Sequence, residues 1–326
     1  MSAHKFFVSQ FIFYTQLFSY ETKNNITCTS PLKLKSKVEN KMAAKNVQIT
    51  VLIEDSKSPA KPHLKSKHGL SFFIKAKIDD SEVTIMMDTG PTPEDLLHNV
   101  AAMDINLQNV DVIALSHGHY DHTGGLIAAL KRMKKRVPVI GHPTVFGPKL
   151  KIMPHLKFIG APFIASEVES AGGVPLLTAD SVKIADGIIT TGEVPRITAF
   201  ESVRGFWNVH NRKFVEDKML DDQSLVIDVE GKGLVVVAGC AHAGIINTIK
   251  YAQKITGNSR VYAVLGGFHL GNAENERIQA TVDELEKLDL EFVGPCHCTG
   301  KKATKKFAEA FGDRCQPLHT GDIIEF

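Results

Sequence analysis

The chain has 326 residues, of which 43% are hydrophobic and 23% are charged, as in an ordinary globular protein. This composition excludes a collagen, a long coiled coil and a wholly disordered chain, and no stretch reaches the roughly 18–20 apolar residues of a membrane span. The formal net charge of +2 indicates neither a nucleic-acid partner nor a membrane partner. Five cysteines are too few for a disulfide scaffold, so we expect free thiols and a cytoplasmic, reducing location.

The first 45 residues differ in composition from the rest of the chain. An aromatic-rich stretch over residues 6–20 precedes a polar run that contains several lysines. Polar residues interrupt the aromatic stretch and no small-residue cleavage site follows it, which argues against a secretory signal. We expect residues 1–45 to form a flexible extension. It is either a stretch ahead of a true start at Met42 or a targeting segment.

From residue 47 onward, short runs of β-branched residues alternate with helical patterns. Three strands come first, and then a helix in which Thr92 is the expected N-cap and Pro93 lies in the first turn. A segment rich in glycine, proline and threonine covers residues 160–220 and predicts short strands and a long loop. In chain order, strands are expected at 47–53, 70–75, 83–87, 111–115, 137–141, 156–159, 224–229, 234–238, 261–265 and 291–294, and helices at 94–103, 125–133, 245–255, 273–288 and 301–311.

This order of elements predicts the fold class. Strands come first, strand–helix alternation follows, and the same theme then repeats in the second half of the chain. Such an order predicts an α/β (α+β) protein in which two mixed sheets pack together and helices cover the outside. No composition shift marks a linker, so we expect residues 46–326 to form one domain.

Residues 117–122 read His-Gly-His-Tyr-Asp-His and follow a buried strand almost directly. Imidazole and carboxylate are ligands that Zn²⁺ and similar divalent metals prefer. His117 and His119 are two residues apart, so in an extended stretch they share a face and can hold one ion. Asp121 and His122 can reach a second ion from the same turn. The pattern predicts a metal site, and a surface histidine cluster is the alternative.

This loop resembles the metal motif of the metallo-β-lactamase superfamily, and the resemblance extends over about residues 47–326. It implies a four-layer αββα sandwich with a metal site at one edge, between the two sheets. It also implies a role for Asp88, which lies in a Met-Asp-Thr-Gly stretch after a strand. Asp88 would orient the metal loop from behind the ligands, as outer carboxylates often do; the alternative is a plain turn residue.

Two further histidines follow predicted strands and precede predicted helices. His242 lies in Gly-Cys-Ala-His-Ala-Gly, and His297 lies in Pro-Cys-His-Cys-Thr-Gly. The resemblance implies that His242 completes a first metal site with His117 and His119. It implies likewise that His297 joins the Asp121–His122 pair at a second metal site.

One departure from the superfamily pattern concerns the segment between these two histidines. The superfamily usually supplies an aspartate there that bridges both metals, whereas this chain reads Gly-Gly-Phe-His-Leu. His269 stands near the expected position, as a metal ligand, a substrate-contacting acid or a plain loop residue. Asp221 and Asp222 are further, less favoured candidates for a carboxylate near the site. Without a bridging carboxylate, one bound metal and two bound metals both remain open.

The cysteines beside the motif histidines have a simpler interpretation. In a strand, neighbours of an inward-pointing residue point away from it. We therefore expect Cys240, Cys296 and Cys298 to be structural thiols, and a soft-metal clip at Cys-x-Cys is the alternative. The eight remaining histidines, among them His68, have no partner at ligand spacing and are expected to be ordinary.

Within the superfamily, the chain resembles the branch of 7,8-dihydropterin-6-methyl-4-(β-D-ribofuranosyl)aminobenzene-5′-phosphate synthases, which is linked to methanopterin-type cofactor synthesis. The resemblance implies a metal-dependent hydrolase-type enzyme, or a synthase of that fold. The alternatives are a generic phosphodiester, thioester or lactone hydrolase and a non-catalytic metal-binding sensor. The matching stretches are residues 68–72, 88–90, 191–196, 221–225, 239–244, 266–270 and 295–300.

The expected mechanism uses a metal-bound hydroxide that attacks a carbonyl carbon or a phosphorus. Asp121 is both a metal ligand and the expected proton acceptor. Zn²⁺ is the expected metal, with one or two ions, and Mn or Fe are alternatives.

The expected substrate is a small phosphorylated or pterin-like molecule. Arg196 and Arg204 would bind a phosphate or carboxylate, and Trp207 with Phe206 would stack on a flat ring. Solvated loop charges and loop packing are the alternatives. A homo-oligomer is compatible with the sequence.

Overall fold

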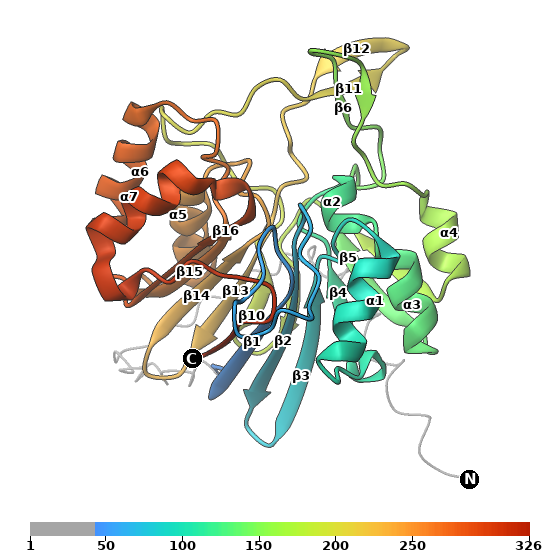
Figure 1. Cartoon of the computed structure of the whole chain (residues 1–326), viewed down its shortest axis with the longest axis horizontal. Helices are drawn as coiled ribbons and strands as arrows, with labels where there is room; N and C mark the ends of the chain where they lie inside the picture. The colour runs from blue at the N-terminus through green and yellow to red at the C-terminus, as the bar shows by residue number, and fades with distance from the viewer. Residues whose placement is uncertain (1–42) are drawn as a thin grey trace, which may run out of the picture. The chain divides into compact units, whose positions relative to one another are not determined.

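Two β-sheets lie face to face at the centre of the molecule, and helices cover the outer face of each sheet (Figure 1). The computed structural model describes residues 43–326; the predicted extension up to Met42 lies outside the described residues. Within residues 43–326, no helix is both long enough and apolar enough to cross a bilayer.

The first sheet contains seven strands. Its first three strands after the edge are antiparallel to one another, and the next three join in parallel. Ahead of this sheet, Ala44 is buried and bridges to Val229 of the other sheet. The strand order is β17 (Ile323–Glu325), β1 (Asn46–Ile53), β2 (Ser71–Ile78), β3 (Ser81–Met87), β4 (Val112–Ala114), β5 (Val137–Gly141) and β8 (Gly173–Leu177).

The second sheet contains six strands. Strands β14, β15 and β16 are parallel to one another, because α5 connects the first two and α6 connects the last two. The strand order is β16 (Phe292–Cys296), β15 (Val261–Gly267), β14 (Gly233–Ala238), β13 (Ser224–Val229), β10 (Ile188–Thr190) and β9 (Lys183–Ala185).

The apolar runs of the sequence are continuous because both faces of these strands are buried. In β14, Val235 and Val237 pack in the core between the two sheets. Leu234, Val236 and Ala238 alternate with them and pack against the helices on the outer face. The alternation of side chains along a strand therefore divides one apolar run between two layers of core.

Three helices cover each outer face (Figure 1). On the first sheet, Thr92 caps α1 as expected, because its hydroxyl accepts a hydrogen bond from the Asp95 backbone N–H over 3.2 Å. The four-layer αββα arrangement expected from the sequence is confirmed. The helices are α1 (Pro93–Ala102), α3 (Leu126–Met133) and α4 (Ala165–Ser170) on the first sheet, and α5 (Ile245–Thr256), α6 (Asn275–Glu286) and α7 (Lys301–Phe311) on the second.

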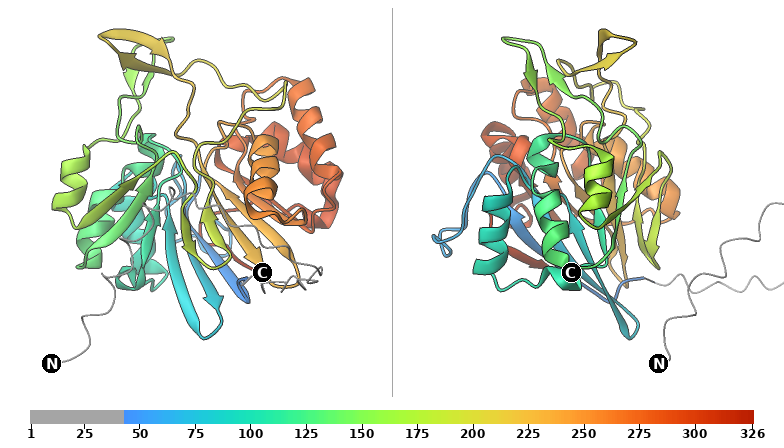
Figure 2. Two further views of the ribbon diagram at one scale, coloured as in Figure 1. Left: turned by 180° about the vertical axis from the view of Figure 1, so that it is seen from behind. Right: turned by 90° about the vertical axis from the view of Figure 1, so that its right-hand side faces the viewer.

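A small third sheet projects from one end of the sandwich (Figure 2). The sequence predicts a strand at residues 156–159, and short strands with a long loop over residues 160–220 without their bounds, because these strands are too short for a clear alternation. The strand order is β12 (Lys213–Glu216), β11 (Trp207–His210), β6 (Leu150–Lys151) and β7 (Lys157–Phe158).

Candidate metal centre

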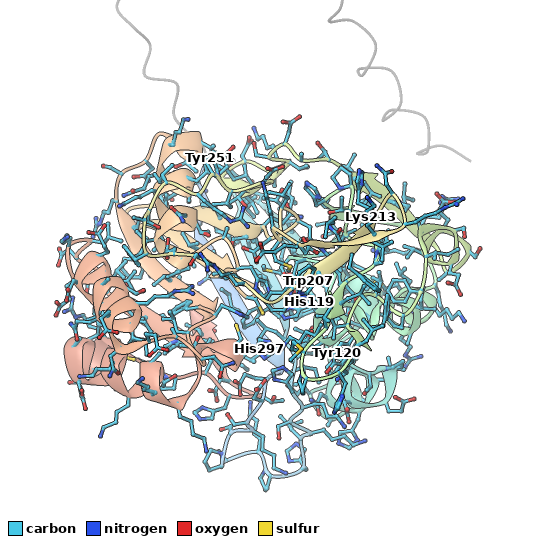
Figure 3. All side chains as sticks on the ribbon, turned by 90° about the horizontal axis from the view of Figure 1, so that it is seen from above. His119, Tyr120, Trp207, Lys213, Tyr251 and His297 are labelled. Atoms are coloured by element: carbon cyan, nitrogen blue, oxygen red, sulfur yellow. The ribbon has the colours of Figure 1, made fainter. Side chains whose placement is uncertain are left out.

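Histidine, aspartate and cysteine side chains gather at one edge of the sandwich, where strands of both sheets end. Figure 3 labels two of them, His119 and His297, near the middle of the view. Strands β4, β14, β15 and β16 all end at this edge, and each is followed by a short loop that carries the polar residues. All six side chains predicted as metal ligands come together here: His117, His119, Asp121, His122, His242 and His297.

A first cluster consists of His117, His119 and His242. One ligand atom from each lies within 4.8 Å of the others, and His117 Nε2 is 2.9 Å from His119 Nδ1. All three rings are buried, yet both ring nitrogens of His242 and Nε2 of His119 have no hydrogen-bond partner among residues 43–326. Buried polar atoms without partners are costly, so this donor set fits a bound cation.

A second cluster consists of Asp121, His122 and His297. The Nε2 atoms of His122 and His297 are 3.3 Å apart, and Asp121 Oδ2 is 3.6 Å from His297 Nε2. Asp121 and His122 belong to a single helical turn, α2 (Tyr120–Thr123), which brings their side chains to the same place. The arrangement gives nitrogen and carboxylate donors to one point, which suits a divalent metal.

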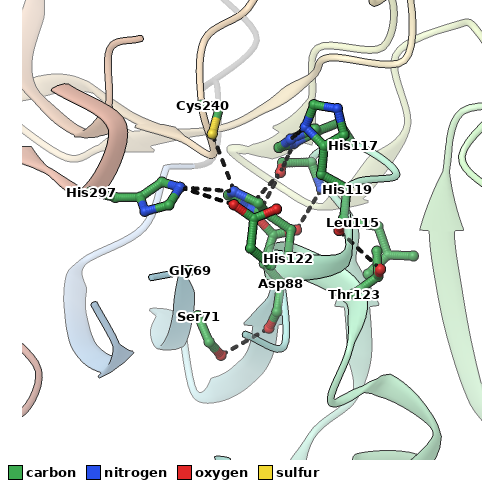
Figure 4. A network of polar contacts seen from close by, with 12 residues as sticks. Gly69, Ser71, Asp88, Leu115, His117, His119, His122, Thr123, Cys240 and His297 are labelled. Carbon is green, nitrogen blue, oxygen red and sulfur yellow. Dashed lines mark hydrogen bonds and ion pairs between the residues drawn. The ribbon is translucent and has the colours of Figure 1, made fainter. Parts of the chain in front are cut away.

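Asp88 lies directly behind the metal loop, after β3. Its Oδ1 accepts a hydrogen bond from the Ser116 N–H over 2.7 Å, and its Oδ2 accepts one from Ser116 Oγ over 2.6 Å. Oδ2 is also 2.7 Å from His122 Nδ1, and Ser116 Oγ is 2.9 Å from His117 Nδ1. These contacts occupy the Nδ1 atoms, so Nε2 of both histidines faces the cluster (Figure 4).

A second carboxylate, Asp55, holds His297 in the same way. Asp55 Oδ1 is 2.6 Å from His297 Nδ1, and Glu54 Oε1 accepts a hydrogen bond from the His297 N–H over 2.7 Å. Asp55 Oδ2 is 2.9 Å from His68 Nδ1, and His68 Nε2 is 3.4 Å from Asp121 Oδ2. The expectation that His68 is an ordinary histidine is therefore wrong, because it contacts a residue of the second cluster.

Burial keeps most of these imidazoles neutral. It lowers the pKa of His117 and His242 well below the ordinary value, and it lowers the pKa of His119 to about 3. Burial also opposes protonation of His122, but the Asp88 carboxylate outweighs it and raises the pKa of His122 to about 9. The three histidines of the first cluster are thus in the neutral form that binds metals.

Two of the three cysteines near the motif histidines contradict the expectation of structural thiols that point away. Cys240 Sγ lies 3.2 Å from His122 Nε2, and Cys298 belongs to the same group of donors as Cys240 and His297. Strand alternation fails here because both cysteines lie beyond the ends of β14 and β16, and His297, directly before Cys298, has a positive φ angle of 48°. Cys296, still inside β16, packs in the core between the sheets as expected.

His269 follows β15 and lies beside the first cluster. Its ring centroid is 4.2 Å from that of His242, and its buried Nδ1 has no hydrogen-bond partner. One ligand atom from each of His269, His242 and Cys240 lies within 4.8 Å of the others. The structure therefore places His269 at the site and in the wall of the cavity described next.

A cavity of about 670 Å³ opens above both clusters. His119, His242 and His297 lie in its lining, and Phe206 packs on the first two with ring centroids 5.1 and 5.0 Å away. Four cationic side chains also line it: Lys151, Lys157, Arg204 and Arg277. The cavity thus joins the metal-binding donors to a positively charged wall.

The predicted substrate residues separate into two groups. Arg204 lines the cavity, whereas Arg196 and Trp207 are not among its lining residues. The Arg196 guanidinium donates hydrogen bonds to the carbonyl oxygens of Lys218 and Met219, so it fixes a loop. Trp207 pairs within the small third sheet.

Asp221 and Asp222 hold the loops of the site and do not face its donors. Asp221 Oδ2 accepts a hydrogen bond from the Gly118 N–H over 2.9 Å, and its Oδ1 is 2.7 Å from Lys149 Nζ. Asp222 Oδ2 accepts a hydrogen bond from the Ala243 N–H over 2.9 Å. Burial raises the pKa of Asp222 to about 6.

The sequence gives no signal for several residues of this site. Asp55 and His297 are 242 positions apart, and Lys149 and Asp221 are 72 positions apart. Arg277 lies in the first turns of α6, where a surface arginine is unremarkable. For Asp221, the only signal in the sequence is the Asp-Asp-Gln stretch before β13, which is one of the stretches that resemble the family.

Comparisons with known proteins agree with this geometry. The family model of the metallo-β-lactamase superfamily matches residues 68–297. The chain is 37% identical over 287 residues to the 7,8-dihydropterin-6-methyl-4-(β-D-ribofuranosyl)-aminobenzene-5′-phosphate synthase of Methanocaldococcus jannaschii, a match that covers 86% of this chain and 97% of the relative. An uncharacterized protein of the same organism is 31% identical over 244 residues, covering 75% and 88% of the two chains.

Solved structures share the fold. The structure of Tm1679, a metal-dependent hydrolase of the β-lactamase superfamily, superposes with a TM-score of 0.72 at 26% identity, covering 86% of this chain and 99% of that one. The metallo-β-lactamase fold protein YhfI of Bacillus subtilis has a TM-score of 0.50 at 10% identity, covering 86% and 100%, which shows the fold alone.

Proposed function

The chain belongs to the metallo-β-lactamase superfamily and is a metal-dependent enzyme of that fold, and we propose that it acts on a small phosphorylated molecule that also carries a flat ring. The observation that carries the proposal is the cavity, whose floor holds the metal-binding donors and whose wall holds four cations. Its activity is of the kind named for the M. jannaschii relative, whose product contains a dihydropterin, a ribofuranosyl-aminobenzene and a 5′-phosphate.

The metal would be held by the two clusters. His117, His119 and His242 form one set of donors, and Asp121 with His122 and His297 forms the other. When bound, a divalent cation lowers the pKa of a coordinated water and stabilises negative charge that develops on oxygen.

Asp121 is the residue placed to accept a proton. Its Oδ2 lies between His297 Nε2, at 3.6 Å, and His68 Nε2, at 3.4 Å. The His68 side chain is 60% exposed, so it connects the buried carboxylate to solvent. Asp55 fixes the orientation of both histidines through its two carboxylate oxygens.

Arg277 is the residue best placed to bind a substrate phosphate. Its Nη1 donates to the Ser202 carbonyl over 2.6 Å, which fixes the guanidinium, while its buried Nε has no hydrogen-bond partner. A planar guanidinium binds a phosphate through two parallel hydrogen bonds. Lys151 and Lys157 face the same cavity from the small third sheet and add positive charge.

Phe206 provides the apolar surface for a flat ring. It lies at the cavity wall between the metal-binding histidines and Lys151, whose Nζ is 5.3 Å from the ring centroid. An aromatic ring that stacks there would lie beside the metal-binding donors. The cationic wall and this aromatic surface correspond to the phosphate and the ring of the proposed substrate.

The test compares a phosphorylated compound with its dephosphorylated form. The full chain, loaded in turn with Zn²⁺, Mn²⁺ or Fe²⁺, is incubated with ribofuranosylaminobenzene 5′-phosphate, with and without a dihydropterin that carries a phosphate-type leaving group on its 6-methyl carbon, and products are identified by mass spectrometry. Phosphodiester, thioester and lactone substrates are assayed in parallel. We expect turnover of the phosphorylated compound to exceed that of the dephosphorylated compound and of the lactone.

Variants test whether Arg277 binds the phosphate of the substrate. Arg277→Gln is expected to raise KM for the phosphorylated compound about tenfold, a loss of about 1.4 kcal/mol, and to leave binding of the dephosphorylated compound unchanged. Arg260→Gln is the matched control, because Arg260 donates to the Gly231 carbonyl in an exposed hairpin. Equal effects of Arg277→Gln on both compounds, or better turnover of a lactone or thioester, would contradict the proposal.

A further inference from the structure

The second cluster has a further candidate donor, Cys240, which the strand pattern predicts to be a structural thiol. Cys240 Sγ and His297 Nε2 both approach His122 Nε2, at 3.2 Å and 3.3 Å (Figure 4). Asp121 Oδ2 completes the group at 3.6 Å from His297 Nε2. Cys240, His122 and His297 therefore lie close to one another, and Asp121 adjoins His297.

The distances between these donors match the edges of a metal coordination sphere. A tetrahedral Zn²⁺ bound at about 2.0–2.1 Å to nitrogen and about 2.3 Å to sulfur holds two nitrogen ligands about 3.3 Å apart and a nitrogen and a sulfur about 3.5 Å apart. The His122–His297 and His122–Cys240 separations are 3.3 Å and 3.2 Å. From this geometry we propose that the Cys240 thiolate is a ligand of the second metal ion, beside Asp121, His122 and His297.

The surroundings orient Cys240 toward this point. Nδ1 of His122 and Nδ1 of His297 are occupied by Asp88 and Asp55, so both Nε2 atoms face the thiol. Gly267 packs against the loop from behind: a Cβ there would lie 3.3 Å from the Cys240 Cα. The absence of a side chain at Gly267 lets the loop lie this close to the end of β15.

The two neighbouring cysteines differ from Cys240 in their contacts. Cys296 packs in the core between the sheets. Cys298 Sγ is 3.6 Å from the Cys240 carbonyl oxygen, and a Cβ on Gly267 would lie 2.6 Å from it. Cys298 also belongs to one group of donors with Cys240 and His297, and Cys240 is distinguished by its 3.2 Å contact with His122 Nε2.

A thiolate at this position selects the metal. Thiolate ligands suit Zn²⁺ and iron, whereas Mg²⁺, Ca²⁺ and Mn²⁺ suit oxygen ligands. The inference rests on the proposed function in that it assumes a metal at the same site, and it narrows the metal of the second position to Zn²⁺ or iron.

The test uses Co²⁺ as a spectroscopic substitute for Zn²⁺ in the metal-free full chain. A thiolate bound to Co²⁺ gives a charge-transfer absorption band in the near ultraviolet. We expect two bound cobalt ions per chain and this band in the native protein, in Cys298→Ser and in the matched control Cys296→Ser. Cys240→Ser is expected to lose the band and to bind about one cobalt ion per chain.

The outcomes separate this inference from the proposed function. A native chain that binds cobalt without the band, or a Cys240→Ser variant that keeps it, overturns the thiolate ligand and leaves the metal enzyme standing. A native chain that binds no cobalt overturns both.

A second measurement applies where Cys240→Ser does not fold, as judged by circular dichroism. The native chain is alkylated with and without Co²⁺, and labelled cysteines are identified by peptide mass spectrometry. Cobalt-dependent protection of Cys240, with no change at Cys315, supports the inference. Equal labelling of Cys240 in both conditions overturns it.

Discussion

Lys149 is a buried cation that connects the small third sheet to the metal loop. Its Nζ lies 2.7 Å from Asp221 Oδ1 and 3.1 Å from Asp217 Oδ2, and its side chain is 4% exposed. Asp221 in turn accepts the hydrogen bond from the Gly118 N–H, between the two histidines that begin the motif. We expect Lys149→Met to destabilise the fold and weaken metal binding together.

The magnitude follows from what the substitution leaves behind. Methionine keeps most of the apolar stem of Lys149, so the packing loss is small. Two buried carboxylates, Asp217 and Asp221, lose their cation, and removing one partner of a buried pair costs about 3–5 kcal/mol. An exposed pair such as Lys183–Asp186 contributes only about 0–1 kcal/mol, so Lys183→Met is the matched control.

The assay is urea unfolding of the metal-free full chain, followed by circular dichroism, with metal affinity measured by chelator competition. We expect the free energy of unfolding to fall by about 3–5 kcal/mol in Lys149→Met and by less than about 1 kcal/mol in Lys183→Met. The double variant Lys149→Met/Asp221→Asn should recover part of the loss, because asparagine removes one unpaired charge and still accepts from Gly118. A loss below about 1 kcal/mol in Lys149→Met would refute the reasoning.

The pH dependence of this interaction has a definite sign. Burial opposes the charge on Lys149, but Asp221 and Asp217 outweigh it and raise its pKa. Because the folded-state pKa exceeds the unfolded value of about 10.4, the stabilisation is fully present below that pH. It is lost as the pH rises through the folded-state pKa.

Three further substitutions test other parts of the site. Glu201→Ala removes the carboxylate that accepts hydrogen bonds from two N–H groups at the start of α5. Urea unfolding should show that the free energy of unfolding falls by about 2–3 kcal/mol, and by less than about 0.5 kcal/mol in the exposed control Glu309→Ala. Burial raises the pKa of Asp222 to about 6 from an unfolded value of about 3.9, so the free energy of unfolding falls as the pH rises from about 4 to 6. Asp222→Asn should remove this pH dependence in unfolding curves measured at a series of pH values. Asp88→Asn withdraws the carboxylate partner of His122 and should weaken metal binding about 10–100-fold in chelator competition, and an unchanged affinity would contradict that role.

The sequence predicts the centre of this site well because its signals are local. The six residues 117–122 follow a buried strand, and His242 and His297 each follow another. β14 and β16 run parallel in the second sheet, so the residues that follow them lie at one edge of that sheet. The loop of residues 117–122 follows β4 of the other sheet, and the resemblance to the superfamily, rather than strand periodicity, predicted that the two edges meet.

The error on Cys240 and Cys298 has a physical reason. The prediction extended strand alternation beyond the strand, whereas β14 ends at Ala238 and β16 ends at Cys296. Cys240 lies two residues beyond the end of β14, and His297, which directly precedes Cys298, adopts a positive φ angle. Backbone angles of this kind in non-glycine residues leave no trace in hydrophobic periodicity.

Contacts between distant segments could not be predicted at all. Asp55 and His297 are in contact although 242 positions separate them in the sequence. Lys149, in a loop beside a two-residue strand, contacts Asp221. Such pairs depend on which strand ends face one another after folding. A single sequence contains residue types and local spacing, and neither records that arrangement.

The candidate metal donors and the residues proposed to bind the substrate come from different parts of this molecule. The donor side chains follow strands of the two large sheets, which are buried on both faces and rigid. Lys151, Lys157 and Phe206 come from the small third sheet and the segment next to it, which project beyond the sandwich. Substitutions there can change the substrate while the metal donors stay in place. Lys149 is the exception, because its bond to Asp221 joins the projecting sheet to the metal loop.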